Sequence, residues 1–215
     1  NTIVHVGKNF EGHTDKTIEA KGKLAAPGFI DTHVHSGHRA SHRLITDTGR
    51  PMYYGQPFLE ISVPKEGKIV KGDPRYLKHG DAGSEAAFQL NATFTVAELL
   101  RNGVTTFVEY GSQLRVQDAL LAEVSRLGTR AYLAPGYDCG RWVGDEQGRL
   151  KRVRDDVMGL KGLETALDWI AKNDGTAAGR VRGILVPREV ETSSIELLER
   201  TRAAADQLKL PIATH

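Results

Sequence analysis

After residue 84, stretches with a helical spacing of apolar residues alternate with short β-branched runs, and this alternation constrains the fold more than any other feature. The predicted helices cover about residues 85–102, 116–127, 160–170 and 193–208, and the predicted strands cover 104–108, 131–133, 181–186 and 211–215. Such an alternation forms βαβ units, in which parallel strands are covered by helices. An open doubly wound sheet and part of a TIM barrel both satisfy it. No glycine-rich dinucleotide fingerprint follows a predicted strand, which favours the barrel.

One more strand precedes this series and ends in two histidines. A Pro-Gly turn at residues 27–28 leads into an apolar run at 29–34, which predicts a short buried strand. Side chains two residues apart on a strand point the same way, so His33 and His35 are expected side by side. Two ligands of one divalent metal need this placement. The alternative is a pair of polar residues at the end of a strand, without a metal.

Two domains are expected along the chain. Residues 2–6 and 17–20 alternate as short strands between glycines, so residues 1–26 are predicted to be part of a small β-sandwich side domain. Residues 27–215 are predicted to form the N-terminal part of a TIM-barrel domain, with about five of the eight strands. A half-open barrel would expose a large apolar edge, so we expect further chain after residue 215.

A long irregular segment, residues 36–83, follows the two histidines and is rich in proline and glycine. Loops of this length inside compact domains are usually functional or disordered. Because active-site loops of barrels leave the C-terminal ends of strands, we expect this segment to line a substrate pocket. Its tyrosines, Tyr53 and Tyr54, are candidates for that wall. Packing against a neighbouring subunit is the alternative.

Composition narrows the class of protein. The chain has 29 basic and 27 acidic residues and a formal net charge of +2, which gives no reason to expect nucleic acid or an acidic membrane as a partner. No apolar run reaches membrane-spanning length. The single cysteine, Cys139, excludes an intrachain disulfide and fits a reducing compartment. A cytoplasmic enzyme is therefore expected.

The run PGFIDTHVH at residues 27–35 resembles the first barrel strand of the amidohydrolase superfamily of metal-dependent hydrolases. The run ELLRNGVTT at residues 98–106 is similar to one branch of it, which includes cytosine and guanine deaminases, triazine hydrolases and phenylurea and molinate hydrolases. The resemblance implies that His215, at the end of the fifth predicted strand, joins His33 and His35 as a metal ligand. The alternative is a terminal histidine without a partner.

The resemblance also bears on the number of ions. Superfamily members that hold two metals often bridge them with a carboxylated lysine after the fourth strand. The nearest residue here is Arg188, whose guanidinium cannot play that role, which implies one divalent ion. Zinc is expected, and cobalt, iron and manganese are alternatives. The remaining metal ligands and the general acid and base are expected beyond His215, so the catalytic residues are not assigned.

The implied reaction is attack of metal-bound hydroxide on a carbon that carries a nitrogen leaving group, in an amide, urea, carbamate or aminated heterocycle. The expected partners are a small-molecule substrate and further copies of the same chain. Two alternatives stay open: a truncated, non-catalytic half-barrel that acts as an interaction module, and a two-metal amidohydrolase. Metal stoichiometry separates the second alternative from the one-metal enzyme.

Three residues at strand ends are candidates for substrate binding: Glu109, Tyr110 and Arg188. Strand ends supply substrate contacts in barrels. For Glu109 and Tyr110 the alternative is a structural polar role. For Arg188 the alternative is an ion pair with its neighbour Glu189.

Overall fold

The computed structural model of the 215-residue chain describes residues 3–36, 85–145, 147 and 149–215. Its main sheet has four strands in the order β1-β2-β3-β6, and every pair is parallel. These strands are β1 (Phe29–Val34), β2 (Val104–Glu109), β3 (Arg130–Leu133) and β6 (Val181–Gly183). The residue range 36–83, predicted as a pocket wall, lies outside the described residues after Ser36.

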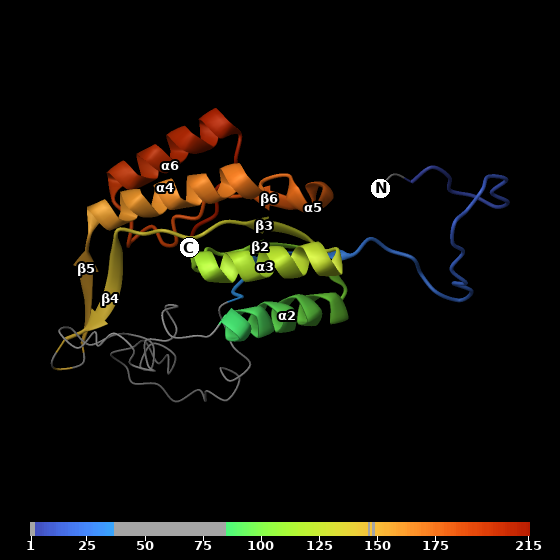
Figure 1. Ribbon diagram of the computed structural model, residues 1–215, viewed down its shortest axis with the longest axis horizontal. Coiled ribbons are helices and arrows are strands. Elements are labelled where there is room, and N and C mark those ends of the chain that lie inside the picture. The colour runs from blue at the N-terminus through green and yellow to red at the C-terminus, as the bar shows by residue number, and fades with distance from the viewer. Residues whose placement is uncertain (1–2, 37–84, 146, 148) are drawn as a thin grey trace.

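Helices connect successive strands and pack on the sheet. They are α2 (Glu85–Arg101), α3 (Leu114–Leu127), α4 (Asp156–Asn173), the single turn α5 (Thr176–Gly179) and α6 (Ile195–Leu208). Figure 1 shows α2 beside α3 on one side of the strands and α4 beside α6 on the other. None of the described helices is long and apolar enough to cross a membrane.

A fifth parallel segment continues the sheet beyond β6. Leu185 forms a parallel bridge with Ile212, and the backbone N–H of Ala213 donates to the carbonyl of Leu185 at 3.0 Å. The N–H of His215 then donates to the carbonyl of Arg188, also at 3.0 Å. The strand predicted at residues 211–215 therefore pairs where the alternation placed it, and the predicted α/β fold, a partial TIM barrel, is confirmed.

The core lies between the sheet and its helices. Phe107, Leu120 and Leu133, from β2, α3 and β3, are fully buried there. Each of these side chains lies on the apolar side of its helix or strand, as the helical and strand periods of the apolar residues predicted. Glycine ends two of the elements: Gly103 and Gly128 have φ of 79° and 83°, a left-handed backbone that glycine adopts without steric cost.

A β-hairpin replaces the loop expected between the third strand and the next helix. Strands β4 (Gly140–Gly144) and β5 (Leu150–Arg154) pair antiparallel as a separate two-stranded sheet.

The helix predicted at residues 160–170 starts earlier than its apolar spacing suggested. The reason is that the side chain of Asp155 accepts a hydrogen bond from the N–H of Met158 at 2.9 Å and caps α4.

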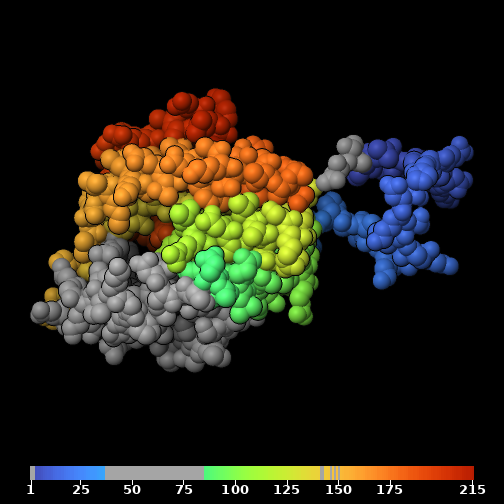
Figure 2. Space-filling model, viewed as in Figure 1, coloured from blue at the N-terminus to red at the C-terminus, as the bar shows by residue number. Residues whose placement is uncertain are grey.

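The segment before β1 differs from the prediction. Residues 3–28 contain no strand, so the two strands expected at 2–6 and 17–20 do not form in the described part. Their side chains are exposed, and Figures 1 and 2 show the segment extending away from the body of the molecule. A strand needs a neighbour for its backbone hydrogen bonds, and the described residues supply none here. That residues 1–26 belong to a side domain stays a prediction.

The burial of β1 was also predicted incorrectly. Val34 is buried, but Phe29 and Ile30 are 69% and 68% exposed. β1 is the edge of the four-stranded sheet, so only the side that meets β2 and the helices is covered by described residues. An apolar run predicts burial from composition, whereas burial depends on what packs against the strand.

Candidate metal centre

The imidazoles of His33, His35 and His215 meet at one end of the sheet. The Nε2 atoms of His33 and His35 lie 2.9 Å apart, and the Nε2 atom of His215 lies 3.0 Å from that of His33 and 3.2 Å from that of His35. All three side chains are exposed, and they form the one group of three candidate metal ligands among the described residues. Residues 182 positions apart are thus brought together.

Curvature of the sheet makes this meeting possible. His33 is on the first strand in the sheet and His215 follows the fifth segment. In a flat sheet, strands one and five would be about 19 Å apart, at about 4.8 Å for each interval. Two imidazoles cannot close that gap. The sheet therefore curls around its own axis as a barrel does, with the three histidines at the C-terminal ends of the strands.

The triangle of Nε2 atoms fits a divalent ion. Zinc binds imidazole nitrogen at about 2.0–2.1 Å in tetrahedral geometry, which places two such nitrogens about 3.3 Å apart. The observed separations of 2.9, 3.0 and 3.2 Å are slightly shorter. Three ligands on one side leave the fourth tetrahedral position open. Catalytic zinc sites have this arrangement, whereas structural sites are closed by four protein ligands.

The tautomer of His215 follows from its hydrogen bond. Its Nδ1 lies 2.9 Å from the carbonyl oxygen of Arg188, and a carbonyl only accepts. Nδ1 therefore carries the proton, and in the neutral ring Nε2 presents a lone pair to the other two histidines. A carbonyl or carboxylate that accepts from the second ring nitrogen is the usual support of a metal-bound histidine. The sequence did not predict that the backbone carbonyl of Arg188 would support His215 in this way.

Tyr110 lies directly against the histidines. Its ring stacks on that of His33 with centroids 3.9 Å apart and planes 22° apart, and its centroid is 4.8 Å from that of His215. The backbone N–H of Tyr110 donates to the carbonyl of Val34 at 3.0 Å, which extends the pairing of β1 with β2. The predicted site residue Tyr110 therefore lies against the three histidines and is half-buried.

Glu109 points elsewhere. It is fully buried, and its carboxylate accepts hydrogen bonds from the hydroxyl of Ser36 at 2.7 Å and the N–H of Ser112 at 3.0 Å. The Ser112 hydroxyl and the side-chain amide of Gln117 also donate to it. This placement favours the structural role over substrate contact by Glu109. The partners Ser36, Ser112 and Gln117 were missed, since nothing local in the sequence links them.

Arg188 does not pair with Glu189, the alternative that the sequence left open. Its Nε donates to the carbonyl of Gly111 at 3.0 Å, and its Nη1 lies 3.7 Å from the carboxylate of Asp138. The guanidinium thus spans the ends of β2, β3 and β6, and the side chain of Arg188 remains 30% exposed.

Burial raises the pKa of the half-buried Glu189 carboxyl, and the nearby charges of Glu191 and Asp138 add to this shift.

The chain is similar to a known family over most of its length. The model of the amidohydrolase family matches residues 24–215. A 5-methylthioadenosine/S-adenosylhomocysteine deaminase of Thermococcus onnurineus is 28% identical over 216 residues, which cover 100% of this chain and 43% of the relative. A 5'-deoxyadenosine deaminase of Methanobrevibacter smithii is 26% identical over 214 residues and is covered to 41%. The chain therefore spans less than half the length of these curated relatives.

Solved structures share the fold. Guanine deaminase of E. coli superposes with a TM-score of 0.57 at 19% identity, over 88% of this chain and 36% of that one. An atrazine chlorohydrolase of Arthrobacter aurescens, complexed with zinc and atraton, superposes with a TM-score of 0.60 at 20% identity, over 88% of this chain and 40% of that one. The family match over residues 24–215 and this shared fold lead to one conclusion: the chain belongs to the amidohydrolase family.

Proposed function

We propose that the intact protein is a hydrolase that holds one divalent ion, zinc, on His33, His35 and His215 and cleaves carbon–nitrogen bonds of small molecules. The observation that carries the proposal is the convergence of three Nε2 atoms within 2.9–3.2 Å of one another. Neutral imidazoles at this spacing direct lone pairs at one point, and a cation there relieves their repulsion. A bound ion of this kind supplies the Lewis acidity that activates water at neutral pH and polarises the bond under attack.

The residues around the triangle have separate tasks in this proposal. The carbonyl of Arg188 keeps His215 in the tautomer that leaves Nε2 free. The ring of Tyr110 packs on His33 and limits its rotation. Because Tyr110 is half-buried and lies against both His33 and His215, it is suited to contact a flat substrate ring by stacking.

One ion rather than two fits the polar groups present. Arg188 is the residue nearest to the position at which two-metal members of the superfamily often carry a bridging lysine, and a guanidinium stays protonated and repels a cation. Its interactions with Gly111 and Asp138 hold it at that place. The described residues contain no second group of three candidate ligands.

The substrate class follows from the relatives rather than from the geometry. Those compared are named as deaminases of adenine nucleosides and of guanine, and as an atrazine chlorohydrolase. All of these names point to nitrogen heterocycles that lose an exocyclic substituent. We therefore propose an aminated heterocycle as substrate, with ammonia as the product.

Metal analysis of the purified intact protein tests the proposal. We expect about one zinc per chain, and we expect His33→Ala, His35→Ala and His215→Ala each to lose most of it. His13→Ala is the matched control, because His13 is exposed in the segment before β1 and its ion-pair partner among the described residues is Asp15, at 3.8 Å. Full occupancy in the three variants, or two tightly held ions per chain, would contradict the one-metal site.

Ammonia release from a panel of adenine nucleosides, guanine and amino-triazines tests the reaction. We expect turnover of at least one of these compounds, loss of turnover after chelation, and recovery with added zinc. A protein that binds one zinc but hydrolyses none of them, nor any amide or urea, would favour the interaction-module alternative.

A further inference from the structure

A largely buried polar cluster lies behind the histidines, on the opposite face of the sheet, and is formed by Ser36, Asn91, Glu109, Ser112 and Gln117. Glu109 is the register partner of Val34, the residue between His33 and His35. Both Glu109 and Val34 are buried, whereas the two histidines are exposed. The carboxylate thus faces the helices while the imidazoles face the opposite side of β1.

The cluster holds the residue that follows His35. β1 ends at Val34, so His35 has left the strand. Ser36 is fully buried, and its hydroxyl donates to Glu109 at 2.7 Å. Its carbonyl accepts a hydrogen bond from the side-chain amide of Asn91 on α2. The backbone on the C-terminal side of His35 is therefore fixed through Ser36, and Glu109 is the hub of that attachment.

Within the described part of the chain, Glu109 has four hydrogen-bond donors and no cationic partner. The Nε2 amide group of Gln117 and the N–H of Ser112 are both donors, and both use the same carboxylate oxygen. The two serine hydroxyls fill the other oxygen. Among the described residues no Lys, Arg or His forms an ion pair with Glu109. A buried carboxylate normally needs a positive partner, and an ion bound on the other side of β1 would supply one.

We propose that Glu109 is a positioning residue for the metal centre: it fixes His35 through Ser36, and its negative charge supports a cation held by His33, His35 and His215. This inference rests on the proposed function. It assigns to Glu109 a task across the sheet instead of the substrate contact suggested by its place at a strand end.

Glu109→Gln tests the inference because it keeps the shape and removes the charge. We expect zinc affinity, measured by competition with a chelator, to fall about tenfold to a hundredfold, which is the usual effect of losing a partner that supports a metal ligand. The visible spectrum of the cobalt-substituted protein should also change, since the orientation of His35 would be altered.

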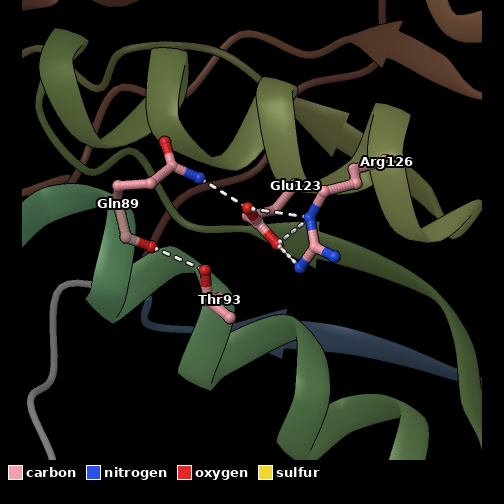
Figure 3. A network of polar contacts seen from close by, with 4 residues as sticks. All are labelled: Gln89, Thr93, Glu123 and Arg126. Atoms are coloured by element: carbon pink, nitrogen blue, oxygen red, sulfur yellow. Dashed lines mark hydrogen bonds and ion pairs between the residues drawn. The ribbon is translucent and has the colours of Figure 1, made fainter. Parts of the chain in front are cut away.

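Glu123→Gln is the matched control. Glu123 is also a buried carboxylate, but it lies between α2 and α3, where Arg126 and Gln89 bind it at 2.6 Å each (Figure 3). We expect this variant to lower thermal stability and to leave zinc affinity and the cobalt spectrum unchanged. Equal losses of zinc affinity in both variants would show a general effect on folding and would overturn the proposal.

Ser36→Ala provides a second test in case Glu109→Gln does not fold. It removes only the hydroxyl that joins Glu109 to the backbone after His35, so zinc affinity should fall in the same direction by a smaller factor. Unchanged affinity in Ser36→Ala, or in a folded Glu109→Gln, would overturn the positioning role. If the histidine variants lose zinc while Glu109→Gln keeps it, only this inference fails and the proposed function stands.

Discussion

The Nδ1 atom of His215 donates to the backbone carbonyl of Arg188 at 2.9 Å, while the N–H of His215 donates to the same oxygen at 3.0 Å. Both bonds use the main chain of Arg188, so the orientation of His215 does not depend on which side chain stands at position 188. The guanidinium of Arg188 is directed to Gly111 and Asp138 instead. The proposed support of a metal ligand by the carbonyl of Arg188 and the proposed substrate contact of its guanidinium are thus separable.

Arg188→Ala should therefore retain about one metal ion per chain. We expect its effect on kinetics instead, with KM raised about tenfold or more if the guanidinium contacts substrate. Metal analysis and steady-state kinetics on the same preparation check this. Arg188→Lys is the control for charge, because lysine keeps the charge but lacks the planar fork of donors. Loss of the ion from Arg188→Ala would show that the side chain supports His215 after all.

Glu189→Gln should raise the stability of the protein at neutral pH. Burial raises the pKa of Glu189, so the folded state binds its proton more tightly than the unfolded state does. Its ionisation therefore costs stability as the pH rises from the unfolded pKa through the folded pKa. Glutamine removes this cost. Thermal unfolding at pH 7 should show that Glu189→Gln is more stable than the parent protein, and at pH 4 this difference in stability should be smaller. A difference that is larger at pH 4 than at pH 7 would contradict the prediction.

Ser194→Ala should destabilise the protein by about 1–2 kcal/mol, the usual range for losing a helix N-cap. The Ser194 hydroxyl accepts from the N–H of Leu197 at 3.0 Å, and it is buried at the start of α6. The preceding residue serves as the comparison, because the Ser193 hydroxyl donates to the carbonyl of Glu189 at 2.8 Å and does not cap the helix. Urea unfolding of both alanine variants should rank Ser194→Ala as the more damaging.

Gly159→Ala should destabilise α4, although alanine favours helix by about 1 kcal/mol over glycine. A Cβ at this position would lie 2.4 Å from the Sγ of Cys139 and 3.1 Å from the carbonyl oxygen of Asp138. Overpacking of this kind costs about 1–3 kcal/mol. Adding Cys139→Ala should recover part of the loss. If Gly159→Ala is as stable as the parent protein, the helix does not pack this closely on residue 139.

Local patterns in the sequence were sufficient for the strand and helix order. The alternation after residue 84 predicted β2, β3, β6 and the helices between them, because burial of one helix face or one strand side leaves its period in the sequence. The spacing of His33 and His35 placed two imidazoles on one side of a strand for the same reason. The family resemblance of residues 27–35 added His215 and the barrel.

Tertiary structure alone decided the rest, since it depends on which residues meet across the sheet. Sequence patterns gave no sign of the β4–β5 hairpin or of the exposure of Phe29 on the edge strand. The contact of Ser36 with Glu109 joins residues 73 positions apart. The periodicity of apolar residues indicates whether a side chain is buried, but not which partner it contacts. The approach of His215 to His33 depends on the curvature of the whole sheet, which no local pattern encodes.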